Sequence, residues 1–172
     1  MAHELYTRTN QKIFFAGLAL ENLRKAEAGQ AMNAQGLAQA EREAALFHLY
    51  GAVLGLCHEI AGFYHLAEAN APRVELLLNQ LALEAAPSPE MAELMELVQQ
   101  PETWLARLLA EHAALFQPPR APKTAKVDPT LPLIQAVTVE DEELPLTQAE
   151  LESWRQQLKQ LVLRFRGALN ES

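Results

Sequence analysis

The chain has 172 residues, a formal net charge of −8 and 6% aromatic residues. This length suits one domain, residues 1–172, with a single core. The acidic balance argues against direct binding of nucleic acid, because neutralising phosphates requires clustered Lys and Arg, and no long basic stripe is present. One cysteine, Cys57, rules out an intramolecular disulfide framework and favours a cytoplasmic location.

The segment Glu4–Ala28 repeats apolar residues at helical spacing and predicts the first helix. The longer stretch Asn33–Asn70 predicts a central helix. Within it, Gly51 and Gly55 lie four residues apart and share one face. Small residues on one face let another backbone come close, and we expect the partner to be the first helix at Gly17. A kink at the glycines is the alternative.

The most apolar part of the central helix is Ala44–Tyr64, which only His48, His58 and Glu59 interrupt. A helix that is apolar on nearly every side must be surrounded by other helices. Its longest uncharged run is too short for a membrane span and matches a buried core helix. We therefore expect the rest of the chain to cover this helix, and no membrane association.

Three short acidic helices are predicted between Pro72 and Phe116. The first spans Pro72–Ala86, the second follows the cap, proline and acid of Ser88–Pro89–Glu90 and ends near Gln99, and the third spans Pro101–Phe116. After them, six prolines predict an extended crossover strap over residues 117–146, because proline interrupts helices.

The last helix begins with a capping box, in which Thr147 is followed three residues later by Glu150. Apolar residues then recur at helical spacing to the end of the chain, which favours a bundle seam, with a self-association face as the alternative. The sequence thus predicts an all-α fold. We expect an antiparallel bundle of about six helices around the long central helix, with a proline-rich extended crossover strap before the last helix.

Polar residues in and just after the apolar segment form a candidate pocket: His48, His58, Glu59, Tyr64 and His65. His58 and His65 are seven residues apart, so a continuous helix would place them on one face. Two turns separate such imidazoles by roughly 10 Å, too far to share one zinc ion on a straight helix. We therefore expect structural histidines, no metal and no cofactor. A small-molecule or metal pocket near His48 and His58 is the alternative.

Two further patterns point only weakly to chemistry. Arg42 with His48, and Arg107 with His112, fit the spacing of helical ribonucleases of the HEPN type, but such pairs also arise by chance in this composition. Cys57 lies in apolar surroundings that favour a buried structural thiol over a nucleophile.

The opening MAHELYTRTNQKIFFAGLALENLRKAE and the later segment HLYGAVLGLCHEIAGFY resemble a family of small uncharacterised all-helical proteins from gammaproteobacteria. This resemblance implies an all-α protein of the bacterial cytosol, and it assigns no activity, cofactor or functional residue. Functionally, we expect a non-enzymatic interaction or regulatory protein. Its partner would be another protein or a second copy of the chain, as in a homodimer, and the predicted docking surfaces are the acidic short helices and the strap.

Overall fold

The computed structural model describes residues 2–119 and 144–171, and these ranges contain six α-helices and no strand. The long helices are α1 (Ala2–Ala28), α2 (Ala34–Phe63) and α6 (Gln148–Asn170). The short ones are α3 (Gln80–Ala85), α4 (Pro89–Gln99) and α5 (Trp104–Ala114), preceded by a 3₁₀ turn, η1 (Val74–Leu76). The predicted all-α bundle of about six helices is confirmed. Residues 120–143, which make up most of the predicted strap, lie outside the described residues.

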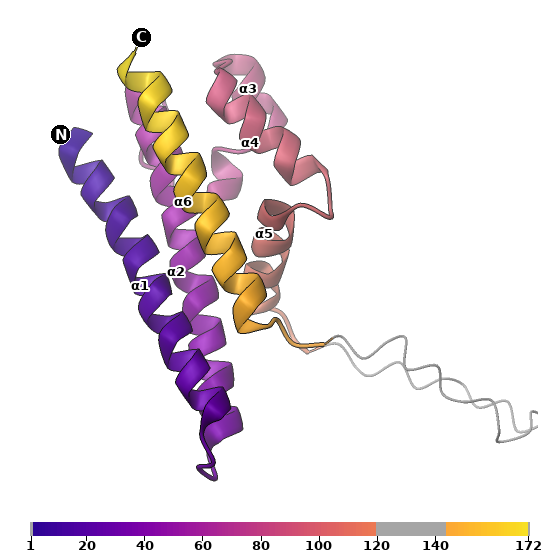
Figure 1. Ribbon diagram of the computed structural model, residues 1–172. Helices are drawn as coiled ribbons and strands as arrows, with labels where there is room; N and C mark the ends of the chain where they lie inside the picture. The colour runs from indigo at the N-terminus through magenta and orange to yellow at the C-terminus, as the bar shows by residue number, and fades with distance from the viewer. Residues whose placement is uncertain (1, 120–143, 172) are drawn as a thin grey trace, which may run out of the picture.

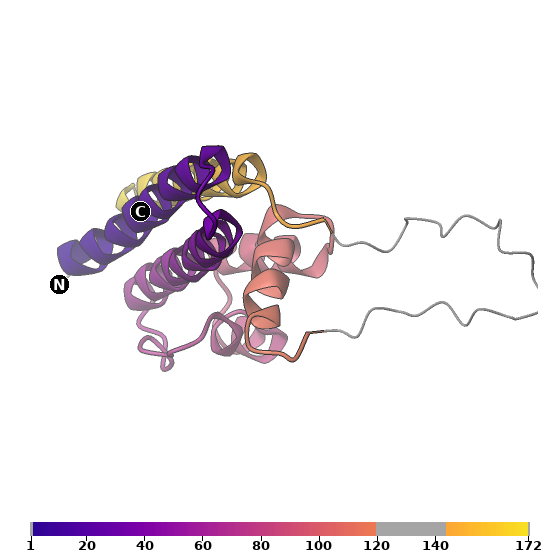
Figure 2. The same ribbon diagram turned by 90° about the horizontal axis from the view of Figure 1, so that it is seen from below.

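The long helices lie side by side, and the short helices pack on the other side of α2 (Figure 1, Figure 2). α1 and α2 form an antiparallel hairpin, whereas α6 runs antiparallel to α1 and in the same direction as α2 (Figure 1). α2 contacts α1, α4, α5 and α6, which makes it the central helix of the bundle.

The core position of α2 follows from its composition. Every residue from Ala52 to Ala61 is buried, including the two polar residues His58 and Glu59. By length and composition alone α2 could also cross a bilayer, but 78% of its most apolar window is buried inside the fold. Its apolar surface is therefore covered by neighbouring helices, as a helix with no polar face requires.

Close packing between α1 and α2 occurs at the glycines, as expected, but with other partners. A Cβ atom at Gly55 would lie 2.6 Å from the Oγ1 atom of Thr9, and one at Gly51 would lie 3.3 Å from the side chain of Lys12. The expected contact with Gly17 is wrong. Gly17 faces α6, where a Cβ atom would lie 2.8 Å from the guanidinium of Arg155.

Three predicted helix boundaries after the core segment are wrong, and the first is the end of α2. α2 ends at Phe63 instead of Asn70, because His65 adopts a left-handed conformation with φ of 53°. The N–H of Leu66 then donates to the carbonyl of Ala61 at 2.9 Å, which closes the helix end. Glycine usually occupies such a position, so a histidine there gives no stop signal in the sequence.

The predicted helix Pro72–Ala86 is also wrong, because Asn79 divides it. The backbone of Asn79 is extended, its side-chain amide donates to the carbonyls of Glu75 and Leu76, and its side-chain oxygen accepts from the N–H of Ala82. Asn79 thus ends the η1 segment and caps α3.

The other start signals are better predicted. Ser88 caps α4 by accepting from Met91, and Thr147 caps α6 by accepting from Glu150. α5 begins at Trp104 and not at Pro101, since Thr103 supplies its cap.

Candidate functional site

His58 lies in the buried part of α2 and holds the chain that follows the helix. Its side chain is buried, and its Nε2 atom lies 2.6 Å from the backbone carbonyl oxygen of Ala71. Because a carbonyl oxygen only accepts, Nε2 carries the proton and donates. The imidazole therefore has a structural partner in the loop after α2.

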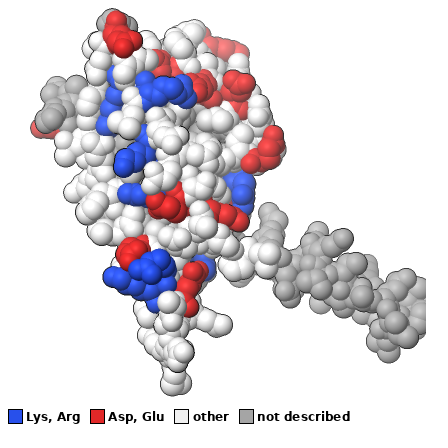
Figure 3. Space-filling view, in the orientation of Figure 1, with Lys and Arg blue, Asp and Glu red and all other residues white. Residues whose placement is uncertain are grey.

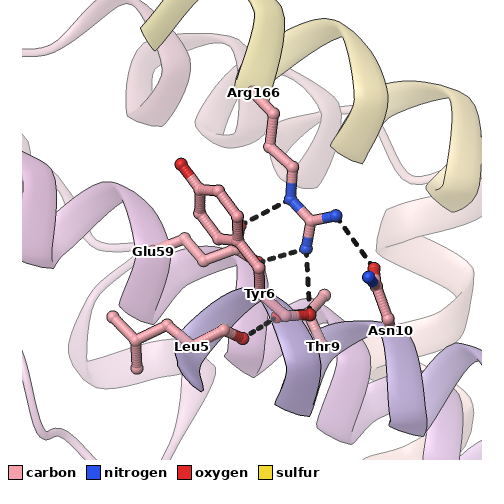
Figure 4. Close-up of polar contacts among 6 residues, drawn as sticks. All are labelled: Leu5, Tyr6, Thr9, Asn10, Glu59 and Arg166. Atoms are coloured by element: carbon pink, nitrogen blue, oxygen red, sulfur yellow. Dashed lines mark hydrogen bonds and ion pairs between the residues drawn. The ribbon is translucent and has the colours of Figure 1, made fainter. Parts of the chain in front are cut away.

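Glu59 forms a buried ion pair with Arg166 of α6 (Figure 4). Its two carboxylate oxygens accept from the guanidinium at 2.8 and 3.1 Å, and its side chain is 1% exposed. The same guanidinium donates to the side chain of Asn10 and the backbone carbonyl of Tyr6, and stacks 4.5 Å from the Tyr6 ring centroid. One arginine thus joins α6 to both α1 and α2.

His48 lies half-buried between the rings of Phe15 and Phe47, whose centroids are 5.4 and 5.5 Å from its own. Its Nδ1 atom is buried and has no hydrogen-bond partner among the described residues. Burial, and to a smaller extent the charge of Lys12, lowers the pKa of His48. The neutral imidazole is therefore favoured, packed as part of an aromatic cluster.

Tyr64 and His65 line a pocket of about 360 Å³ between the end of α2 and the segment η1–α4. The hydroxyl of Tyr64 donates to the buried carboxylate of Glu90 at 2.7 Å, and this acceptor raises the pKa of Tyr64. His65 is exposed at the rim.

The five predicted pocket residues therefore do not share one cavity. Tyr64 and His65 line a common pocket, whereas His48, His58 and Glu59 contact three separate sets of partners. The sequence argument placed His58 and His65 on one helix face. The structure corrects this, because α2 ends before His65.

The remaining sequence candidates have structural surroundings. Burial raises the pKa of the Cys57 thiol to about 12, so the reactive thiolate is strongly disfavoured. Among residues 2–119 and 144–171, no group of three or more His, Cys, Asp or Glu side chains is placed to hold a metal ion.

The two arginine–histidine pairs are also engaged elsewhere. Arg42 donates to the backbone carbonyl of Leu146 at 2.8 Å. Arg107 pairs with Glu150, and His112 stacks on the ring of Tyr50 with centroids 3.7 Å apart.

Sequence reasoning missed a groove between α1 and α6. Its upper part, about 340 Å³, is lined by residues of both helices: Asn10, Ile13, Phe14, Arg155, Lys159, Val162, Leu163 and Arg166. A second part, about 420 Å³, shares Phe14 and Arg155 and extends along the same seam towards Glu21 and Gln148. The guanidinium of Arg155 crosses the seam where the two parts meet, because it donates to the carbonyl of Ile13 and lies against Gly17. The two parts together are hereafter called the α1–α6 groove.

Charge is unevenly placed around the molecule. On the face drawn in Figure 3, Lys and Arg follow the side formed by α1 and α6, while many Asp and Glu gather towards α3 and α4. The upper part of the α1–α6 groove agrees, because it is lined by Arg155, Lys159 and Arg166 and by no carboxylate.

The sequence pattern of a family of unknown function, DUF6586, matches residues 1–172. The chain belongs to this family. None of the curated proteins and none of the solved structures shows significant similarity to this DUF6586 protein.

In this DUF6586 protein, the polar residues His58 and Glu59 of α2 hold the fold together. Two of its open features are the α1–α6 groove and the Tyr64 pocket. A signal for the groove was present in the sequence, since the apolar stripe of the first helix includes Phe14 and Leu18 and is wider than one core contact needs.

Proposed function

We propose that this DUF6586 protein is a non-enzymatic interaction protein that binds a partner helix in the α1–α6 groove. The observation that carries the proposal is a set of exposed apolar side chains along one seam: Phe14 is 58% exposed, Leu18 49% and Leu163 62%. These residues line the groove and do not belong to the buried core. Contiguous exposed apolar surface with a polar rim is typical of interaction sites.

The two parts of the groove together have the length of a short helix. Along α1 it runs from Asn10 to Glu21, a distance of roughly 16 Å at the helical rise of about 1.5 Å per residue. Three turns of an amphipathic helix fit this length, with apolar anchors spaced by three or four residues.

Charge indicates an acidic partner for the upper part of the groove. Lys159 is exposed and forms no ion pair within the described part of the chain, whereas Arg166 is neutralised by Glu59. A partner helix carrying Glu or Asp beside its apolar ridge complements Lys159.

Structural engagement of the polar groups in α2 supports the non-enzymatic part of the proposal. His58 is bound to a backbone carbonyl, both oxygens of Glu59 are bound to Arg166, and Cys57 is buried. A catalytic acid, base or nucleophile must instead reach a substrate.

A defined peptide tests the proposal. The probe is a fluorescent amphipathic peptide of about 14 residues, four helical turns, with a leucine ridge flanked by glutamates. Leu163→Glu should weaken its binding about tenfold or more, because a carboxylate in the groove loses an apolar contact and repels the flanking glutamates. Phe116→Glu is the matched control, since Phe116 is 74% exposed and lies outside the groove.

Three results would overturn the proposal: absence of saturable binding, equal loss in both variants, or equal binding of a peptide with lysine flanks. Sedimentation measures the homodimer directly. A stable dimer that Leu163→Glu dissociates would make a second copy of the chain the occupant of the groove.

A further inference from the structure

A second site lies beside α3, on the side of the bundle away from α1. The pocket of about 360 Å³ has a mostly apolar lining formed by the end of α2, the chain after it and the segment η1–α4. Its lining residues are Tyr64, His65, Leu66, Ala67, Glu68, Leu77, Ala82, Leu83, Ala85, Ala86 and Met91. It is separate from the α1–α6 groove and shares no residue with it.

The space exists because α3 covers it without filling it. None of the six residues of α3 is buried, and Leu81 is 80% exposed. Figure 1 shows α3 at the edge of the bundle, away from α1. A helix whose apolar side chains Leu83 and Ala82 face an unfilled pocket leaves apolar surface for a ligand to bury.

The lining also restricts the charge of a ligand. The acidic residue of the lining is Glu68, and the carboxylate of Glu90 lies behind Tyr64, whose hydroxyl donates to it. Among the described residues, no Lys or Arg lines this pocket. Carboxylates at an apolar pocket favour an ammonium group over a carboxylate group on the ligand.

The size is that of a small molecule. A cavity of about 150 Å³ accommodates benzene, and small-molecule sites in proteins begin at about 300 Å³. From this geometry we infer that the pocket binds a small cationic amphiphile, an apolar chain of roughly eight carbons with an ammonium head at Glu68.

Titration of the full-length protein with n-octylamine, followed by NMR chemical shifts, tests the inference. Octanoate and octanol serve as comparison ligands with the same chain, and all three are kept below the concentration at which they aggregate. Octylamine should bind saturably and more tightly than octanoate. Shifts should concentrate on Leu66, Leu83 and Met91.

Two pairs of variants locate the binding. Ala82→Phe should fill the pocket and abolish octylamine binding, whereas Leu81→Phe, at the neighbouring exposed position outside the lining, should leave it unchanged. Glu68→Gln should weaken octylamine by about threefold, the range of an exposed ion pair, and leave octanol unchanged. Thermal unfolding checks that each variant is folded.

Octanoate binding as well as octylamine, or octylamine binding undiminished by Ala82→Phe, would overturn the inference. The absence of saturable binding would overturn it too. Leu163→Glu should not affect this binding, so failure here and failure of the proposed helix-binding groove are distinguishable.

Discussion

Long-range side-chain contacts join the three long helices, whereas the short helices are delimited by contacts between near neighbours. Arg166 reaches Glu59, Arg155 reaches the carbonyl of Ile13, and each contact crosses more than one hundred residues of sequence. The short helices instead begin at side chains that accept from an N–H three residues ahead, as Thr103 does. The relative placement of the long helices therefore depends in part on individual arginines, whereas the starting points of the short helices depend on local capping.

Loss of the buried ion pair between Glu59 and Arg166 should have the largest effect on stability. Glu59→Gln leaves Arg166 with its charge only partly compensated in a largely buried position, which should lower the free energy of unfolding by about 3–5 kcal/mol. Urea unfolding measures the change. Glu93→Gln is the matched control, because its pair with Arg164 is exposed and should contribute less than about 1 kcal/mol.

The double variant Glu59→Leu with Arg166→Met sharpens the test. Removing both charges together avoids the unpaired ion, so much of the loss should be recovered. If Glu59→Gln costs no more than Glu93→Gln, the ion pair does not hold the long helices together.

Gly55→Ala should have the next largest effect, since its Cβ atom would meet both Oγ1 and Cα of Thr9 on the adjacent helix. Such overpacking costs about 1–3 kcal/mol. Gly167→Ala is the matched control in α6, where a Cβ atom meets nothing within 4 Å. That variant should gain about 0.5–1 kcal/mol, because alanine favours the helix. A gain from both substitutions would show that α1 and α2 are not closely packed at Gly55.

Thr103→Ala tests how far α5 depends on its local cap. Thr103 caps α5 and also donates to the carbonyl of Leu97 at 2.6 Å, so its loss should cost about 1 kcal/mol. Hydrogen exchange should show faster opening of α5 with α1 unchanged. Equal acceleration in both helices would mean that the short helices unfold only together with the long ones.

The features that the sequence predicts well depend on residues that lie close together along the chain. The capping residues Ser88 and Thr147 announce α4 and α6, and the apolar segment of α2 announces a buried helix. The missed boundaries had misleading local signals. His65 occupies a position where glycine would have marked the end of α2, and Asn79 interrupts a run whose leucines repeat at helical spacing.

The candidate site was harder to predict, because the partner of each of its residues is distant in the sequence. Nothing near Glu59 in sequence announces its partner Arg166, and nothing near Gly17 announces Arg155. The groove requires Phe14 and Leu163 to be brought together from opposite ends of the chain. Periodicity alone identifies such residues as apolar, but it does not show which remain exposed.

The smallest expected effect concerns His48 of α2. Its Nδ1 atom is buried and has neither a long-range nor a local hydrogen-bond partner among the described residues. Burial lowers the pKa of His48, so the unfolded state binds protons more readily as the pH falls below about 6.5. The free energy of unfolding should therefore fall as the pH is lowered from 7.5 to 5, and His48→Gln should reduce that slope.

Burial also lowers the pKa of His112, so the double variant His48→Gln with His112→Gln should flatten the slope further. Urea unfolding at several pH values measures this. A slope unchanged in both variants would show that carboxylates alone account for the pH dependence. A steeper slope in His48→Gln would mean that the protonated ring is the one held between Phe15 and Phe47.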